Sequence, residues 1–257
     1  MKMTLRKKLY VFVASAFVIH FLFIYAKSSP FTKVANPDTA VVAIDSYPDV
    51  SGNEVSPKNN LSLYDTLNLG GLGLSREAFD YAIAGYKYLR AEGKLQNDNI
   101  VSIVDFSLAS SKKRLFIIDL SNNKILFNTY VSHGRNSGRE VANQFSNQAE
   151  SNKSSLGFYV TGGTYMGKHG FSMRLLGEEK GINDNANSRA IVMHSAAYVS
   201  EAAIKMQGFI GRSLGCPALP EALTKPIIEK IKNGSCLFLY GPDKSYASNS
   251  TILKKVA

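Results

Sequence analysis

The chain has 257 residues, of which 45% are hydrophobic, and a formal net charge of +10. This length has room for one sizeable domain with appendages, and the composition excludes a largely disordered chain and a coiled coil. The lysines and arginines form no dense stripe with interleaved aromatic residues, so nucleic-acid binding is not indicated.

The first 26 residues predict a segment for export. Four basic residues lie among the first eight, and the run from Leu9 to Ala26 that follows has no charged residue. This is the pattern of a secretory signal peptide or an uncleaved signal anchor, and both alternatives stay open. We expect the rest of the chain to be exported to the periplasm or cell envelope. It would contact the inner membrane only through an uncleaved N-terminus.

Three further parts are expected after this segment. Residues 27–70 predict an exported linker, because their first half is rich in Ser, Pro, Asn and Asp. A catalytic-sized domain is expected over residues 71–245 and a C-terminal tail over 246–257. The domain begins with a predicted helix from about Ser75 to Gly93, since apolar residues repeat at helical spacing behind a serine that suits an N-cap.

From about residue 99 the pattern changes to short β-strands. Two apolar runs, 114–119 and 125–131, flank a polar turn and predict a β-hairpin. A polar stretch at 133–155 follows, and loops of this length inside a compact domain are usually functional or mobile. Other strands are expected at 100–106, 158–160, 172–176, 190–193 and 236–240, and short helices at 199–209 and 220–232. The fold class is therefore mainly β with a few short helices.

Cys216 and His194 carry the strongest chemical signal. A thiol attacks as its thiolate and needs a partner that takes its proton, and a nearby imidazole can do so. His194 closes an apolar run, so we expect it at a strand end facing a cleft. Cys216 lies on a turn between Gly215 and Pro217, a setting that fixes the backbone and leaves the sulfur accessible.

The residues around Cys216 suggest support for acyl transfer. The backbone amides of Leu214, Gly215 and Cys216 can point at an oxyanion, which is the second usual requirement of this chemistry. Ser213 can hydrogen-bond the turn, and Ser195 or a backbone carbonyl can orient the imidazole of His194.

Several alternatives remain open on the residues alone. In an exported domain, Cys216 and Cys236 can form a single structural disulfide, which would silence the nucleophile. Cys236 lies in an apolar run and also suits a buried strand. His133 and His169 compete with His194 for the role of base. No metal or cofactor is predicted, because the histidines are dispersed and no cysteine pair has zinc spacing.

Two motifs together resemble a known family. The segments His194–Val199 and Gly211–Ala218 look like the murein L,D-transpeptidase catalytic-domain family, a branch of the YkuD-like enzymes. The likeness extends back through Tyr165–Gly170 and Arg189–Met193 and covers roughly residues 75–245. The resemblance implies an L,D-transpeptidase-like β-sandwich domain in which the cysteine lies in a groove reached under a loop.

The resemblance also implies roles and a reaction. Cys216 matches the nucleophile, His194 the base, and Gly215 and Ser213 the supporting turn. The implied partners are peptidoglycan stem peptides, whose cross-linking proceeds through an acyl-enzyme with loss of D-alanine. Water as the acceptor would make the protein a carboxypeptidase. The competing functions are a cysteine peptidase of the envelope and a non-catalytic wall-binding module with a Cys216–Cys236 disulfide.

The chain departs from the family pattern at three positions. The wider superfamily places an arginine two residues after the cysteine, where this chain has Ala218. We therefore expect another arginine to bind a substrate carboxylate. The branch more often has glycine after the histidine and an aromatic residue before Gly-Cys, where Ser195 and Leu214 stand here. The candidate substrate-binding residues are His169, Arg212, Arg189 and Tyr198.

Overall fold

The computed structural model describes residues 62–256. The predicted export segment and most of the predicted linker lie outside the described residues. No helix among residues 62–256 is long and apolar enough to cross a membrane. The helices are α2 (Leu63–Thr66), α3 (Arg76–Ala91), α4 (Glu201–Gln207), α5 (Glu221–Ile231), α6 (Lys244–Asn249) and α7 (Leu253–Val256). The strands are β1 (Ile100–Asp105), β2 (Leu115–Asp119), β3 (Lys124–Thr129), β4 (Gly157–Gly167), β5 (Gly170–Gly177), β6 (Val192–Ser195), β7 (Ala218–Leu219) and β8 (Cys236–Tyr240).

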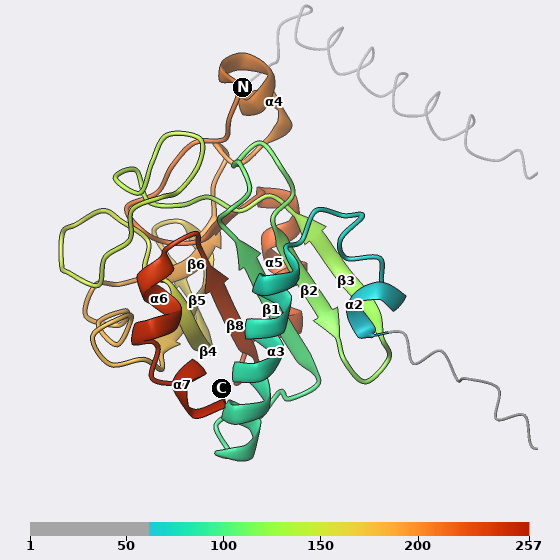
Figure 1. The fold of residues 1–257 in the computed structure, drawn as a ribbon. Helices are drawn as coiled ribbons and strands as arrows, with labels where there is room; N and C mark the ends of the chain where they lie inside the picture. The colour runs from blue at the N-terminus through green and yellow to red at the C-terminus, as the bar shows by residue number, and fades with distance from the viewer. Residues whose placement is uncertain (1–61, 257) are drawn as a thin grey trace, which may run out of the picture. The chain divides into compact units, whose positions relative to one another are not determined.

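The eight strands form one curled sheet in the order β3-β2-β1-β8-β4-β5-β6-β7. Neighbouring strands are antiparallel except for the pairs β1–β8 and β6–β7, which are parallel. Helices α3, α6 and α7 lie on the face of the sheet nearest the viewer in Figure 1, and α5 lies behind it. The predicted mainly β domain with a few short helices is confirmed, and the predicted hairpin corresponds to β2 and β3.

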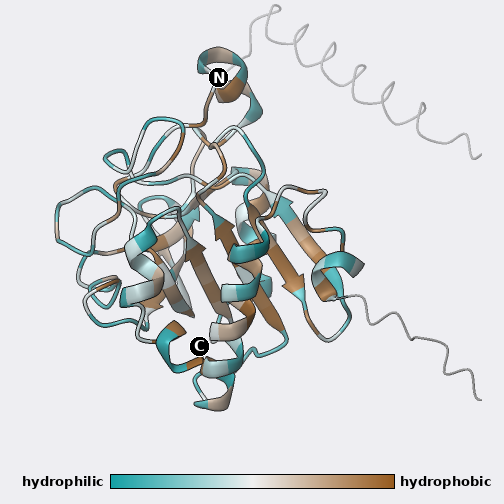
Figure 2. Ribbon diagram, in the orientation of Figure 1, coloured by the Kyte–Doolittle hydropathy of each residue, from teal (hydrophilic) through white to brown (hydrophobic). Residues whose placement is uncertain are grey.

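The centre of the sheet is buried on both faces. Every residue of β1 and β8 is buried, which explains why both strands are nearly continuous apolar runs. In Figure 2 the strands are brown while the loops and the outer sides of the helices are mostly teal. Cys236 begins β8 between Val101 and Val160 and is fully buried. Its thiol therefore packs as a small apolar group.

Helix α3 covers this core as the sequence predicted. Its N-cap is Ser75, whose hydroxyl accepts a hydrogen bond of 3.0 Å from the amide of Ala78. A Cβ added at Gly85 would lie 2.1 Å from the ring of Phe158, so a glycine lets the helix approach the sheet closely. The helix begins and ends within two residues of the predicted bounds.

The C-terminal segment is part of the folded domain, so the predicted tail from residue 246 is wrong. The side chains of Tyr246, Ile252 and Leu253 are buried in the main core. The hydroxyl of Tyr246 donates a hydrogen bond of 2.8 Å to Glu179, a fully buried residue that also accepts from the hydroxyl of Ser250. Three buried anchors in a mostly polar stretch give too little periodicity to predict a helix.

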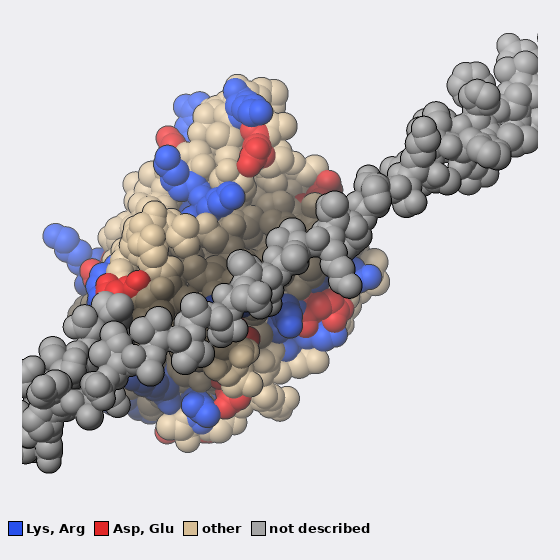
Figure 3. Space-filling view, turned by 90° about the vertical axis from the view of Figure 1, so that its right-hand side faces the viewer, with Lys and Arg blue, Asp and Glu red and all other residues tan. Residues whose placement is uncertain are grey.

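Charged side chains are mixed on the face shown in Figure 3. Basic and acidic groups lie near one another around the rim of the visible part of this face, and neither sign forms a continuous stripe there. Such interspersed charge is typical of a solvated surface.

Candidate active site

The pairing of β6 with β7 places Cys216 next to the strand that carries His194. His194 pairs with Ala218 in this parallel ladder, and Cys216 precedes Ala218 by two residues. The amide of Val192 donates to the sulfur of Cys216 at 3.4 Å, and the thiol faces the carbonyl of Ala190 at 3.7 Å. The thiol therefore lies at the start of β6, two residues before His194. A two-residue strand such as β7 gives no sequence pattern, so this pairing was not predicted.

The imidazole of His194 is held by a backbone carbonyl. Its Nδ1 lies 2.8 Å from the carbonyl oxygen of Ser195, which fixes Nδ1 as the protonated nitrogen of the neutral ring. Nε2 has no hydrogen-bond partner among residues 62–256 and can accept a proton. The hydroxyl of Ser195 points elsewhere and donates to the carbonyl of His169 at 2.9 Å. Of the two predicted orienting groups, the backbone carbonyl is the one that contacts the ring.

Burial favours the neutral forms of His194 and Cys216. Burial lowers the pKa of His194, and the nearby His169 ring adds to this effect, while the bond to Ser195 opposes it. Burial raises the pKa of the Cys216 thiol, and the Val192 amide and the Arg189 charge offset part of the increase. At neutral pH these shifts favour a neutral Cys216 thiol and a neutral His194 imidazole. The arrangement suits proton transfer during attack rather than a preformed ion pair.

The turn before Cys216 is tied together by Ser213. The hydroxyl of Ser213 donates to the carbonyl of Cys216 at 2.6 Å and accepts from the amide of Gly215 at 3.0 Å. The Gly215 amide is therefore occupied and does not serve an oxyanion. The amides of Leu214 and Cys216 have no partner among the described residues, which leaves them as the candidate oxyanion donors. Leu214, two residues before Cys216, is 61% exposed.

Gly215 is required by the shape of this turn. Its φ is +125°, a conformation that side-chain-bearing residues rarely adopt. A Cβ at this position would lie 2.8 Å from the carbonyl oxygen of Lys153. The hydroxyl of Ser154 donates to the Gly215 carbonyl at 3.2 Å. The polar stretch predicted at 133–155 thus packs directly on the turn that carries Cys216.

The two arginines expected to bind substrate are both engaged within the protein. Arg189 donates through one nitrogen to the Ser146 carbonyl at 2.8 Å and through the other to the Lys153 carbonyl at 2.6 Å. It also reaches the hydroxyls of Ser151 and Ser155. Its guanidinium therefore fastens the polar loop to the site. The sequence could not indicate this role, because the partners lie more than 30 residues away.

The other arginine and the tyrosine lie at the edge of the site. Arg212 is exposed and donates from one nitrogen to the carbonyls of Arg135 and Gly138, at 3.1 and 3.2 Å. Burial raises the pKa of the Tyr198 hydroxyl. The hydroxyl of Ser132 lowers this pKa and the nearby Cys216 raises it further. No hydrogen bond within residues 62–256 uses the other nitrogens of Arg212.

The competing histidines have different positions. The ring of His169, from the turn between β4 and β5, stacks on His194 with ring centroids 4.5 Å apart. His133 is buried and has both nitrogens in use, one facing Arg114 at 2.7 Å and the other the Gly138 carbonyl at 3.2 Å. His133 therefore has no free ring nitrogen, whereas the ring of His169 lies directly on that of His194.

Both cysteines are free thiols in the structure, so the predicted alternative of a Cys216–Cys236 disulfide does not describe this fold. Burial raises the pKa of Cys236 well above that of an ordinary thiol, which makes it unreactive. Over residues 62–256, no group of three or more His, Cys, Asp or Glu side chains is placed to hold a metal ion.

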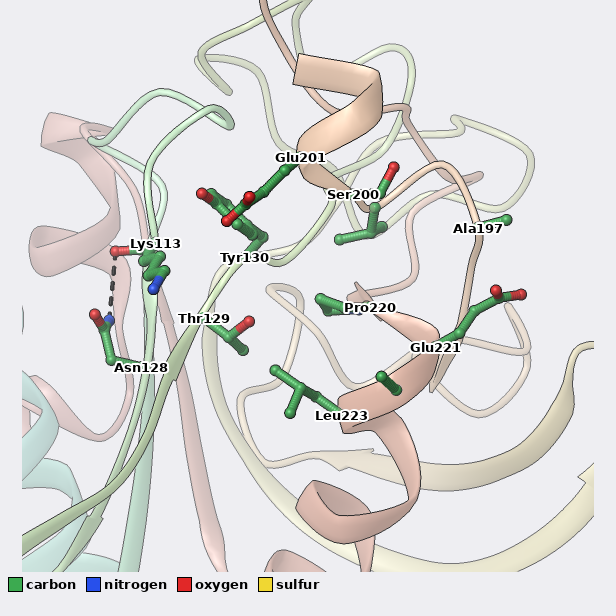
Figure 4. A pocket seen from close by; sticks show the side chains of 12 residues that line it. Lys113, Asn128, Thr129, Tyr130, Ala197, Ser200, Glu201, Pro220, Glu221 and Leu223 are labelled. Atoms are coloured by element: carbon green, nitrogen blue, oxygen red, sulfur yellow. Dashed lines mark hydrogen bonds between the residues drawn. The ribbon is translucent and has the colours of Figure 1, made fainter. Parts of the chain in front are cut away.

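A separate pocket of about 430 Å³ lies beyond the far end of β7. Figure 4 shows it between the end of β3, the segment leading into α4 and the start of α5. Tyr130 and Glu201 approach each other at one wall, and Pro220 and Leu223 form another. Neither Cys216 nor His194 lines this pocket, so it is distinct from the reaction centre.

Comparison with known families gives one broad match. Residues 72–240, more than half of the chain, match the model of the L,D-transpeptidase catalytic domain. A comparison with curated proteins found no match.

Solved structures give remote likenesses. An L,D-transpeptidase from Mycobacterium smegmatis is 12% identical, with 56% of this chain and 59% of that chain covered and a TM-score of 0.34. An L,D-transpeptidase from Stackebrandtia nassauensis is 15% identical, with 57% of each chain covered and a TM-score of 0.34. The helical cell shape determining protein Pgp2 from Campylobacter jejuni is 13% identical, with 56% and 48% covered and a TM-score of 0.36. This chain thus spans less than two thirds of each of these proteins.

Proposed function

The chain belongs to the L,D-transpeptidase catalytic-domain family, and from this premise we propose that it cross-links or remodels peptidoglycan stem peptides through an acyl-enzyme on Cys216. One observation carries the proposal. A partly accessible free thiol lies at the start of β6, the strand that carries His194, and the free Nε2 of this histidine can accept a proton. A nucleophile next to an oriented base is the arrangement that covalent acyl transfer needs.

The first half-reaction forms the thioester. As the sulfur of Cys216 bonds to the carbonyl carbon between residue 3 and D-alanine of a donor tetrapeptide, Nε2 of His194 takes the thiol proton. The Cys216 amide stabilises the oxyanion that develops on the carbonyl oxygen. The carbon–nitrogen bond then breaks, the imidazolium gives its proton to the departing amine, and D-alanine leaves.

The second half-reaction releases the product. The amine of an acceptor stem attacks the thioester carbonyl, and Nε2 of His194 takes one of its protons. The carbon–sulfur bond breaks, the imidazolium returns the proton to the sulfur, and a cross-linked peptide leaves. Water in place of the amine would give a tripeptide, which is the product of an L,D-carboxypeptidase. This hydrolysis is the second candidate function, because the same two residues perform it.

Product analysis separates these functions. The purified domain is incubated with a tetrapeptide stem, with and without a separate amine acceptor, and the products are identified by mass. We expect a cross-linked dimer that has lost one D-alanine, and tripeptide alone would instead establish hydrolysis. Cys216→Ala and His194→Ala should each abolish both products. Cys236→Ala is the matched control, because it removes a buried thiol outside the site and should leave the products unchanged.

The cellular location is part of the proposal. The basic and apolar pattern of the first 26 residues supports export, with the catalytic domain in the periplasm or cell envelope. Fractionation of cells that express the full chain tests this directly. The mass of the mature N-terminus distinguishes cleavage of the segment from its retention as an anchor.

A further inference from the structure

Arg114 is a buried cation whose partners are carbonyl oxygens and a histidine. It is fully buried and donates to the Leu108 carbonyl at 2.9 Å and twice to the Val131 carbonyl, at 3.1 and 2.9 Å. Its remaining contact is with Nδ1 of His133 at 2.7 Å. No carboxylate among the described residues forms an ion pair with it. Burial lowers its pKa to about 9, so it stays charged at neutral pH.

This cation fixes His133 in one protonation state. Because a guanidinium only donates, Nδ1 of His133 must accept, and Nε2 must carry the proton that it donates to the Gly138 carbonyl at 3.2 Å. The ring of Phe106 meets the imidazole edge-on and closes the site from another side. His133 is therefore a rigid neutral element, which is an unusual use of a histidine unless its orientation matters.

The backbone around His133 holds the nucleophile turn on both sides of Cys216. Before the cysteine, the amide of Ser213 donates to the His133 carbonyl at 2.9 Å, and the Ser213 carbonyl accepts from Arg135 at 2.8 Å. After the cysteine, the amide of Ser132 donates to the Ala218 carbonyl at 2.9 Å. The Ala218 amide returns a bond of 3.2 Å to the Ser132 hydroxyl. Residues 132–135 thus hold residues 213–218 by hydrogen bonds on both sides of Cys216.

We infer that Arg114 and His133 are positioning residues for Cys216. They fix the backbone of residues 132–135 and thereby set the position of the thiol. The inference rests on the proposed role of Cys216 as the nucleophile. Neither residue touches the reacting atoms, so both act through the backbone of residues 132–135. A nucleophile displaced by about 1 Å can lose about a hundredfold in rate. The thiol itself would still be present and chemically competent.

Two variants of His133 test the inference. His133→Phe keeps a buried ring but loses the acceptor for Arg114 and the donor to Gly138, whereas His133→Asn keeps a short acceptor near the position of Nδ1. We expect His133→Phe to lower kcat about tenfold or more with little change in KM. His133→Asn should recover part of that loss. Arg114→Lys keeps the charge but loses the planar set of N–H donors of the guanidinium, so it should behave like His133→Phe.

Alkylation of Cys216 provides a readout that a purely structural role would not change. Burial is the main cause of the raised pKa of this thiol. Loosening the turn should therefore move the midpoint of its reaction with iodoacetamide to lower pH. We expect faster alkylation of Cys216 in His133→Phe, together with the lower kcat. Cys236 should stay unmodified, and because it is fully buried its modification would report unfolding.

A variant outside the site serves as the matched control. Tyr246→Phe also removes a buried hydrogen bond, but on the C-terminal segment. It should keep the kcat and the Cys216 alkylation midpoint of the wild type. Wild-type kcat and alkylation in folded His133→Phe and Arg114→Lys proteins would overturn the inference. The alkylation measurement needs no peptide substrate, so it separates failure of this inference from failure of the proposed function.

Discussion

The ring of His169 stacks on the ring of His194, with centroids 4.5 Å apart and planes inclined by 24°. The turn between β4 and β5 carries His169, and the carbonyl of the same residue accepts a hydrogen bond from Ser195. Backbone and ring of one residue therefore both contact the segment that holds the base. A positive charge on His169 opposes protonation of His194, because two cationic rings in contact repel each other.

Replacing His169 should change the pH dependence of the reaction. His169→Phe keeps a stacked ring and removes the charge that lowers the pKa of His194, so this pKa should rise. Since His194 acts as a base in its neutral form, the acidic limb of the plot of kcat against pH should move to higher pH. The control is His169→Ala, which removes charge and ring together. An acidic limb that stays at the wild-type position in both variants would contradict this role for His169.

Gly215→Ala should impair the site more than it impairs the fold. The substitution places a side chain at a φ of +125° and 2.8 Å from the Lys153 carbonyl. Strain of this kind amounts to about 1–3 kcal/mol, and the turn that carries Cys216 can relieve it by moving. We expect a lower free energy of unfolding in urea and a larger loss of turnover. Gly163→Ala is the matched control, because nothing lies within 4 Å of a Cβ there.

Tyr246→Phe should lower stability while leaving turnover near that of the wild type. The variant leaves Glu179 without one of its buried donors, and the loss of such a bond amounts to about 1–2 kcal/mol. Chemical denaturation measures this difference. The same variant with wild-type stability would show that the C-terminal helices do not depend on this bond.

Acid should destabilise the protein partly through His133. Burial lowers the pKa of His133 to about 4, and the charges of Arg114 and Arg212 add to the effect, while the bond to Gly138 opposes it. The folded state keeps this ring neutral while the unfolded chain binds a proton below its ordinary pKa of about 6.5. Keeping His133 neutral therefore costs the folded state no stability above about pH 6.5, and the free energy of unfolding decreases as the pH falls from there toward 4. The whole effect amounts to roughly 3 kcal/mol.

The experiment compares the wild type with His133→Asn at pH 7 and pH 4.5. Urea unfolding should show a smaller loss of stability on acidification for the variant, because asparagine binds no proton. An equal loss in the two proteins would assign the acid sensitivity to other groups.

Local patterns explain which parts of the fold were predictable. The helix over Ser75–Gly93 and the hairpin around residues 121–124 have strong periodicity and clear turn residues, and both are present. The two-residue strand β7 has no period to detect, because a partner strand defines it rather than its own sequence. Helices α6 and α7 are short and depend on a few buried anchors, so their packing also needs the rest of the domain.

Some residues of the site were predictable from the sequence and others were not. Cys216 and His194 were identified from their flanking residues, and the structure places them on paired segments. Arg189 was expected to meet a substrate carboxylate, but its donors are used by the polar loop. Arg114 was not singled out at all. Its importance comes from burial and from contacts up to 19 residues away, and neither is visible in a short motif.

The intact mass of the protein after brief incubation with a tetrapeptide stem tests the central claim most directly. We expect an adduct with the mass of the tripeptide acyl group, and peptide mapping should place it on Cys216 as a thioester that disappears when an acceptor amine is added. His194→Ala should form it far more slowly. An adduct on any other residue, or turnover that persists in Cys216→Ala, would contradict the account.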